Sequence, residues 1–321
     1  MGKRFDLQGH RGARGLKPEN TLPSFEVAFD LGVTSVETDV HLTRDGVPVL
    51  AHEPWITCSL FRKVAESAPL LASEQRLLAG LTLEQLRQYR ADRNPDPQRF
   101  PRQDATVTPL AAWFGQHHGI DPFTPPTLAD LFAFAEAYAS EPGAALGKTV
   151  AQRLHMQSIR FDLELKRVPF HPEVIGDSFT GRSPGLLEER IVEAIRVAGM
   201  LARTTVRSFD HRVVHLLRQM EPELTGAVLV AHTAPVSPVV VARPADADIY
   251  CPSFEFLDAL QVQQAHAAGL HVLPWTVNEP ADWSRLVEWS VDGITTDFPD
   301  RLASWLQGHG ISWLGELEAT S

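Results

Sequence analysis

Residues 159–166 constrain the fold more than any other part of the chain, because apolar and charged side chains alternate along them without a break. Successive side chains of a β-strand point to opposite faces, so one face would be apolar and the other charged. The apolar face carries Ile159, Phe161, Leu163 and Leu165, and the charged face carries Arg160, Asp162, Glu164 and Lys166. An edge strand with a solvated polar face fits this pattern. A strand of a parallel barrel also fits it, because its outer face packs on helices while polar residues point inward.

The rest of the chain favours the barrel. Short β-like segments alternate with amphipathic helical segments, a pattern typical of parallel strands joined by crossover helices. The predicted strands are 5–9, 34–41, 47–52, 159–166, 204–209, 224–230, 271–276 and 293–296, and the predicted helices are 22–31, 128–138, 186–200, 212–220, 257–268 and 281–289. A weaker segment, 248–251, fits a short extra strand or part of a connection. We therefore expect an α/β fold, a (β/α)8 TIM barrel that forms a single domain over residues 1–321.

Residues 53–126 interrupt this alternation. The segment is long and rich in proline, and its one clear helix start is the capping box that begins at Thr82 and ends at Gln85. We interpret it as an insertion after the third predicted strand that caps the barrel.

Three carboxylates are expected to converge inside the barrel. Glu37 and Asp39 share one face of the strand 34–41, about 6.6 Å apart along it. Glu164 lies on the charged face of 159–166, near the end where barrel enzymes place their catalytic groups. The Glu-x-Asp spacing alone is a weak signal, but three buried carboxylates require a compensating cation or protons. All-oxygen ligation favours Mg²⁺ or Ca²⁺, with Mn²⁺ as a further candidate, over zinc.

Two histidines follow predicted strands on the same expected rim, His10 and His52. A histidine at such a position can be a structural hydrogen-bonding residue, but two beside a metal cluster suit a general acid and a general base. Arg11 and Lys166 supply positive charge that could hold a phosphate. The remaining histidines, His41 among them, are interpreted as structural or surface residues.

Composition excludes several classes of protein. The formal net charge of −11 argues against a nucleic-acid partner. Cys58 and Cys251 are the only cysteines and lie in no zinc or redox motif, so reduced thiols are expected. No apolar run of 18 residues is present, which predicts no transmembrane segment, and the lack of a visible leader predicts a cytoplasmic location. Composition gives no indication of the oligomeric state.

Several motifs together resemble the glycerophosphodiester phosphodiesterase family. They cover most of the chain outside the insertion and are Gly9-His10-Arg11-Gly12, Pro18-Glu19-Asn20-Thr21, Glu37-Thr38-Asp39-Val40, Thr43-Arg44-Asp45-Gly46, Ala51-His52, Glu164-Leu165-Lys166, Ser208-Phe209-Asp210, Trp275-Thr276-Val277-Asn278 and Asp292-Gly293-Ile294-Thr295-Thr296-Asp297.

The resemblance implies a hydrolase of lipid and glycerol metabolism that converts glycerophosphodiesters to glycerol 3-phosphate and an alcohol. It implies His10 and His52 as acid/base residues and the three carboxylates as metal ligands. It further implies Arg11 and Lys166 as phosphate contacts and Trp275 as an apolar wall near the glycerol.

The chain departs from the family pattern in the loops. Glu53 stands where the family usually has Asp, and no arginine-bearing turn is recognisable in residues 55–61. The insertion and the loop 167–185 are expected to set the preference for the leaving alcohol. A related lyase or phospholipase D-like activity on lipid head groups remains an alternative, as does a barrel that binds phosphate esters without turnover.

Overall fold

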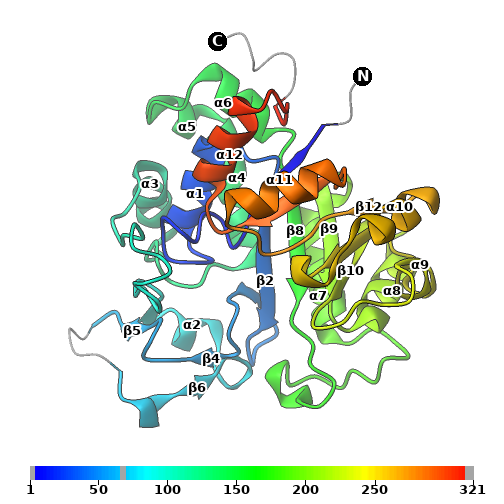
Figure 1. The fold of residues 1–321 in the computed structure, drawn as a ribbon. Coiled ribbons are helices and arrows are strands. Elements are labelled where there is room, and N and C mark those ends of the chain that lie inside the picture. Colours follow the sequence, from blue (N-terminus) through cyan, green and yellow to red (C-terminus); the bar gives the residue numbers. More distant parts are fainter. Residues whose placement is uncertain (1–3, 66–69, 315–321) are drawn as a thin grey trace.

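The computed structural model describes residues 4–65 and 70–314. Within them, eight parallel strands form a ring in the order β12–β11–β10–β9–β8–β2–β1–β13 (Figure 1). Their bounds are β1 Asp6–Gly9, β2 Ser35–Leu42, β8 Arg160–Leu165, β9 Thr204–Ser208, β10 Thr225–Val230, β11 Ile249–Pro252, β12 His271–Val272 and β13 Gly293–Thr296. Three backbone hydrogen bonds close the ring, from Asp292 N–H to the Val272 carbonyl (3.0 Å), from Thr295 N–H to the Pro274 carbonyl (3.1 Å) and from Val277 N–H to the Thr295 carbonyl (2.9 Å). The (β/α)8 barrel predicted from the sequence is confirmed.

Two segments have different roles from those predicted. The segment 47–52 contributes β3 (Pro48–Leu50), which pairs antiparallel with β2 as the second arm of a hairpin and is no member of the parallel ring. The weaker segment 248–251 instead supplies a full barrel strand, β11, paired in parallel with β10 and β12. The insertion therefore follows the third strand of the chain, but the second strand of the barrel.

Helices cover the outside of the ring, except α2, which belongs to the insertion. Their bounds are α1 Leu22–Asp30, α2 Leu83–Leu86, α3 Pro109–His118, α4 Leu128–Ala139, α5 Glu141–Ala145, α6 Val150–Met156, α7 Leu186–Val197, α8 His211–Met220, α9 Val239–Ala242, α10 Ala259–Ala267, α11 Pro280–Glu288 and α12 Pro299–Gly308. The predicted starts of the helices 22–31 and 128–138 are confirmed, and the side chains of Thr21 and Thr127 cap them. The sequence patterns did not indicate α3, α5, α6, α9 or α12. None of the helices in the described residues has the length and apolar character needed to cross a membrane.

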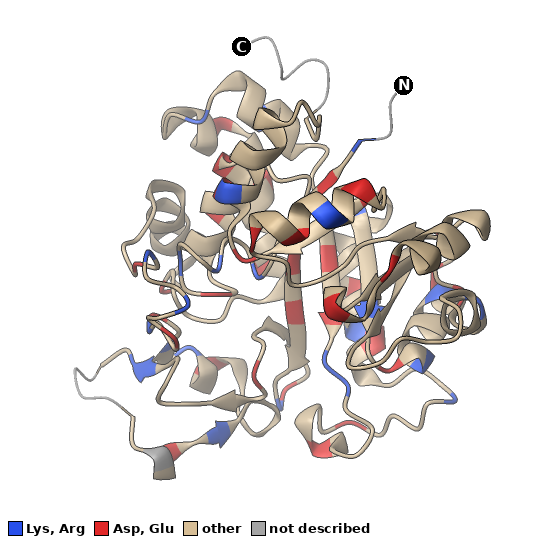
Figure 2. Cartoon of the chain, in the orientation of Figure 1, with Lys and Arg blue, Asp and Glu red and all other residues tan. Residues whose placement is uncertain are grey.

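The apolar face of the strand 159–166 packs outward, as its alternation predicts. Phe161, Leu163 and Leu165 are buried in the main hydrophobic core between the strands and the helices. Phe161 meets Phe132 of α4 edge-on, with ring centroids 5.2 Å apart. The charged face is thereby directed into the ring, where acidic residues of β2 and β8 lie together (Figure 2).

The segment between β3 and α4 forms a small substructure of its own. Two short antiparallel pairs lie within it, β4 (Trp55–Ile56) with β6 (Arg76–Leu77) and β5 (Arg62–Lys63) with β7 (Tyr89–Arg90). A separate group of buried apolar residues, among them Ile56, Phe61 and Leu78, holds these pieces together. In Figure 1 they lie beyond the carboxyl end of β2, so the insertion stands at the mouth of the barrel.

Candidate active site

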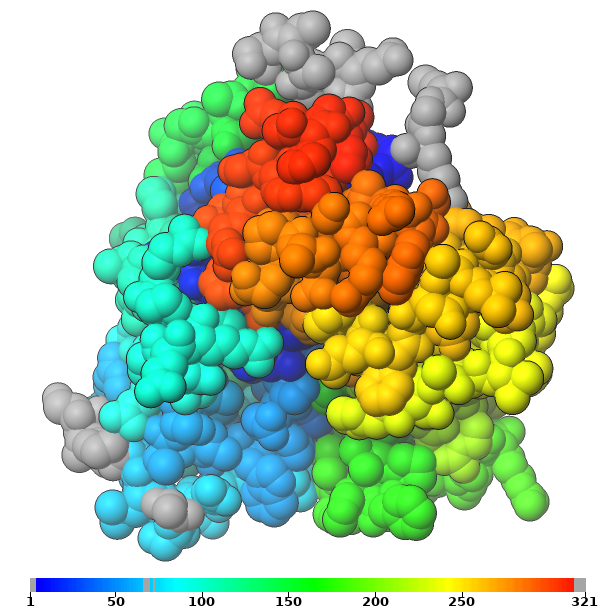
Figure 3. Space-filling model, viewed as in Figure 1, coloured from blue at the N-terminus to red at the C-terminus, as the bar shows by residue number. Residues whose placement is uncertain are grey.

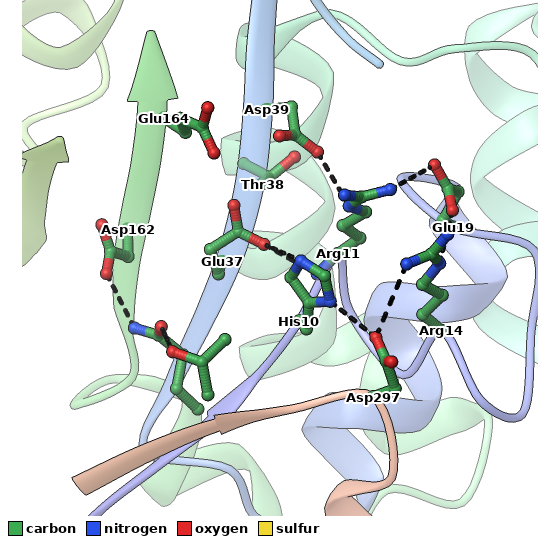
Figure 4. Close-up of polar contacts among 12 residues, drawn as sticks. His10, Arg11, Arg14, Glu19, Glu37, Thr38, Asp39, Asp162, Glu164 and Asp297 are labelled. Carbon is green, nitrogen blue, oxygen red and sulfur yellow. Dashed lines mark hydrogen bonds and ion pairs between the residues drawn. The ribbon is translucent and has the colours of Figure 1, made fainter. Parts of the chain in front are cut away.

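The three carboxylates predicted to converge do so. Glu37 and Asp39 come from β2 and Glu164 from β8, and the strand register places Asp39 directly beside Glu164. One carboxylate oxygen of each residue lies within 4.8 Å of those of the other two, and all three side chains are buried. Alternate side chains of the neighbouring strands β2 and β8 point into the barrel and therefore form an all-oxygen cluster at its mouth (Figure 4).

Crowding and burial perturb these acids in opposite directions. Burial, followed by the charge of Asp39, raises the pKa of Glu37 to about 8. Burial also favours the neutral form of Asp39, but the positive charges led by Arg11 outweigh it and lower its pKa well below the ordinary range. Burial and charge therefore favour a protonated Glu37 beside an ionised Asp39, which limits the repulsion between them.

His10 follows β1 and faces this cluster. Its Nδ1 lies 2.6 Å from Oδ1 of Asp297, and its Nε2 lies 3.7 Å from Oε2 of Glu37 (Figure 4). Burial, and then the charge of Arg11, lower the pKa of His10 to about 4. The imidazole is therefore neutral at pH 7. When Nδ1 donates its proton to Asp297, Nε2 is left free to take a proton.

His52 lies on the same cavity as His10, although it follows the hairpin strand β3 and no barrel strand. Its Nδ1 lies 2.8 Å from Oε1 of Glu53, so the glutamate that departs from the family pattern still contacts this histidine. His52 is partly exposed, in contrast to the buried His10. The two predicted histidines therefore share one cavity but have different environments.

Arg11 and Lys166 lie at the edge of the carboxylate cluster. Arg11 has a positive φ of 52°, and its backbone N–H donates to Oε2 of Glu37 (3.0 Å). Its guanidinium pairs with Glu19 and, at 3.2 Å, with Asp39. Lys166 Nζ lies 2.8 Å from Oε1 of Glu164 and 3.5 Å from Oδ1 of Asp39. Both cations thus border the cavity while they are paired with its acids.

The cavity has a volume of about 580 Å³ and an aromatic side. Trp275 lines it, its indole held by a hydrogen bond from Nε1 to the Cys251 carbonyl (2.9 Å). Phe209 meets the indole edge-on at 5.5 Å between ring centroids. Figure 3 shows the surface hollowed where the cyan, orange and yellow segments meet. The opening is therefore polar on the side of β1 and β2 and aromatic on the side of β9 and β12.

Two buried residues of the site were not predicted. Arg207 of β9 lies with Nη2 3.2 Å from Oε1 of Glu37 and Nη1 3.1 Å from Oδ2 of Asp162. Asp297, after β13, accepts from His10 and, at its other oxygen, from Asn278 Nδ2 (2.8 Å). Alternation along the segment 204–209 places Arg207 on the inward face and could have indicated this residue. Asp297 could have been found from its position just after a strand, where barrel enzymes place their catalytic groups.

A third missed residue, Asn20, supports the cluster from the loop before α1. Its Nδ2 donates to Oδ2 of Asp39 (3.0 Å), and its Oδ1 accepts from the Thr38 hydroxyl (2.7 Å). The residue has a positive φ of 54°, a conformation that asparagine tolerates better than most side chains. Asn20 therefore holds one acid of the carboxylate cluster in a fixed orientation.

Known proteins are similar to this chain in sequence and in fold. A model of the "Glycerophosphoryl diester phosphodiesterase family" matches residues 10–301. The glycerophosphodiester phosphodiesterase of Caldanaerobacter subterraneus is 24% identical over 94% of this chain and 97% of its own. Among solved structures, a putative glycerophosphoryl diester phosphodiesterase from Silicibacter pomeroyi superposes with a TM-score of 0.75 at 29% identity, covering 98% of this chain and 97% of its own.

An Oleispira antarctica phosphodiesterase, solved in complex with the product sn-glycerol-3-phosphate, superposes with a TM-score of 0.64. It is 21% identical and covers 94% of this chain and 96% of its own, so it supports the fold alone.

Proposed function

Because this chain belongs to the glycerophosphoryl diester phosphodiesterase family, we propose that it hydrolyses glycerophosphodiesters to glycerol 3-phosphate and an alcohol, with the help of a divalent cation. The observation that carries the proposal is the buried cluster of Glu37, Asp39 and Glu164 with His10 beside it. Such a reaction belongs to lipid and glycerol metabolism. Its substrate is a small molecule, which the cavity of about 580 Å³ has room to hold.

The residues present fit a divalent cation. Oε1 of Glu37 and Oδ1 of Asp39 are buried and accept no hydrogen bond, although Arg207 and Lys166 lie 3.2 Å and 3.5 Å away. Together with Glu164 these oxygens form a hard donor set, which suits Mg²⁺ or Ca²⁺ and also accommodates Mn²⁺. A cation held there would neutralise charge on the phosphate and lower the pKa of a substrate hydroxyl.

The two histidines suit the proton transfers of the reaction. His10, neutral and held at Nδ1 by Asp297, can exchange a proton at Nε2, the ring atom that faces the carboxylate cluster. His52 lines the same cavity and can serve the other proton transfer. One histidine takes a proton from the nucleophile and the other donates one to the departing alcohol, and the structure leaves the order of the two open.

The substrate carries its own nucleophile. A glycerophosphodiester has a hydroxyl next to its esterified carbon, and intramolecular attack gains a large effective molarity over free water. Attack by that hydroxyl on phosphorus forms a cyclic phosphate and expels the alcohol. Water then opens the ring, and the histidines exchange roles in this second step.

Arg11 and Lys166 supply positive charge on the side of the cavity where the phosphate would lie. Trp275 and Phe209 form an apolar wall for the carbon atoms of the substrate. Lyase activity would use the same residues and stop at the cyclic phosphate. A phospholipase D-like enzyme would accept diesters that carry an acyl chain.

The proposal is tested by incubating the protein with glycerophosphocholine and divalent metal, with and without a chelator. We expect release of glycerol 3-phosphate that stops when the chelator is added. Accumulation of a cyclic phosphate as the final product would establish a lyase instead. Binding of the diester without any product would establish a binding protein.

A further inference from the structure

The segment 98–104 of the insertion packs against the rim of the barrel, and its Phe100 is not part of the apolar core of the insertion. Phe100 is fully buried and lies against Phe298, with ring centroids 6.1 Å apart. Gln103 Nε2 donates to the Arg14 carbonyl (2.7 Å). These contacts fix the segment on the loop after β1 and on the start of α12.

This packing brings Arg99 to the active site. Its Nη2 donates to Oδ2 of Asp297 (2.9 Å), and its guanidinium lies 5.1 Å from the centroid of the Phe100 ring. Arg99 also lines the same cavity as His10 and His52. An arginine of the insertion therefore contacts the acid that holds His10, across 198 positions of the sequence.

The contact determines which oxygen of Asp297 faces the histidine. Oδ2 accepts from two donors, Arg99 Nη2 and Asn278 Nδ2, whereas Oδ1 faces His10 Nδ1 at 2.6 Å. Two donors on one oxygen restrict rotation of the carboxylate and so keep the other oxygen beside the imidazole. Loss of the charged donor would leave Asn278 alone to hold Oδ2.

We propose that Arg99 is a positioning residue for the reaction, which orients His10 through Asp297 and so makes the insertion part of the active site. The inference rests on the proposed function, because it assigns His10 a proton-transfer role. The insertion was expected to set the preference for the leaving alcohol, and this proposal adds a role in proton transfer at the reacting phosphate. A residue that acts through Asp297 affects proton transfer at His10, so removal of Arg99 should lower kcat and leave KM nearly unchanged.

The same segment offers a matched control. Arg102 has a similar exposed side-chain fraction, 52% against 47% for Arg99, and also pairs with one acid, Asp300 at 2.9 Å. Its partner lies on α12 and does not contact His10. The test compares Arg99→Met with Arg102→Met, since methionine keeps an aliphatic stem but removes the charge and the donors.

Turnover of glycerophosphocholine is measured in the presence of divalent metal for the wild type and both variants. We expect Arg99→Met to lower kcat roughly tenfold, in line with loss of one hydrogen bond to a charged group, with KM changed less than about twofold. Arg102→Met should retain the wild-type kcat. In Arg99→Ala, millimolar guanidinium ion should restore part of the lost kcat, a response that general damage to the fold would not give.

Each other outcome has a distinct meaning. A raised KM at unchanged kcat in Arg99→Met would make Arg99 a substrate contact and overturn the positioning role. Equal behaviour of the two methionine variants, or no response of Arg99→Ala to guanidinium, would overturn it too. A wild-type protein that hydrolyses no glycerophosphodiester would instead overturn the proposed function.

Discussion

The Glu37→Gln variant tests two properties of the carboxylate cluster separately. One is the stability that the folded protein loses by burying these acids, and the other is the stability that it gains by binding a cation. The wild-type pKa of Glu37 is raised from 4.5 to about 8, first by burial and then by Asp39. Between these two pH values the folded protein keeps a proton that the unfolded chain releases, so the free energy of unfolding falls as the pH rises. A shift of about 3.5 pH units at about 1.36 kcal/mol each sets an upper limit of about 5 kcal/mol.

The glutamine does not titrate, so the variant should lose this penalty. We expect its stability relative to the wild type to increase by about 2–4 kcal/mol between pH 5 and pH 8.5, less than the limit because this pH window omits part of the titration at each end. Urea unfolding in the presence of a chelator measures the difference at each pH. Glu193→Gln, an exposed residue paired with Arg190, serves as the control and should show no pH trend.

Metal should narrow the difference in stability between the variant and the wild type. A cation at about 100 times its Kd stabilises a folded protein by about 2.7 kcal/mol, and the wild type should gain this amount from Ca²⁺ or Mg²⁺. Glu37→Gln should gain much less, because one of the three ligands has lost its charge. A difference between variant and wild type that stayed flat from pH 5 to 8.5, or equal stabilisation of both by metal, would refute the reasoning.

Further predictions concern catalysis and the fold. His10→Ala and His52→Ala should each lower kcat by at least about 100-fold while metal still raises the melting temperature, and loss of that metal response would contradict the acid/base assignment. A 2-deoxyglycerol analogue of the diester should be hydrolysed far more slowly than its parent, and equal rates would mean that water attacks directly. Glu26 is fully buried, accepts from Leu110 and Ala111 N–H at the start of α3 and pairs with Lys148. Glu26→Ala should lower the free energy of unfolding in urea by about 3 kcal/mol, because it leaves the α3 N–H groups and Lys148 without this partner. A loss below about 1 kcal/mol would refute a stabilising role for Glu26.

The barrel and its carboxylates could be predicted because both depend on local alternation. The parity of residues 159–166 placed Glu164 inside the ring, and the parity of 34–41 placed Glu37 and Asp39 there. Periodicity reports which side of a strand a residue occupies, so neighbouring strands of matching parity locate a cluster without knowledge of the loops.

The error at residues 47–52 had a readable cause. Between β2 and β3 only residues 43–47 are available, and Gly46 has a positive φ of 76° in that turn. A parallel connection needs a dozen or more residues, so this length permits only an antiparallel hairpin. A count of the residues in the connection would have excluded β3 from the ring. The segment 248–251 would then have been predicted as the eighth strand of the barrel.

The long-range contacts of the site have no local signal, even where the position of a residue has one. Asp297 meets His10 across 287 positions of the sequence, and Arg99 meets Asp297 across 198. Neither contact repeats with a helical or strand period, and the second depends on how Phe100 seats the insertion against the barrel. Such contacts follow from tertiary packing, which a pattern of residue types does not encode locally.

The most direct test of the account is a titration of metal into chelated and desalted protein, with the release of glycerol 3-phosphate from glycerophosphocholine as the readout. Three carboxylates that share one ion predict no turnover at the start and a full rate once the cluster is saturated with Mg²⁺, Ca²⁺ or Mn²⁺. Asp39→Asn should stay inactive at the same metal concentrations. Full turnover by the chelated protein, with no response to added metal, would contradict the account.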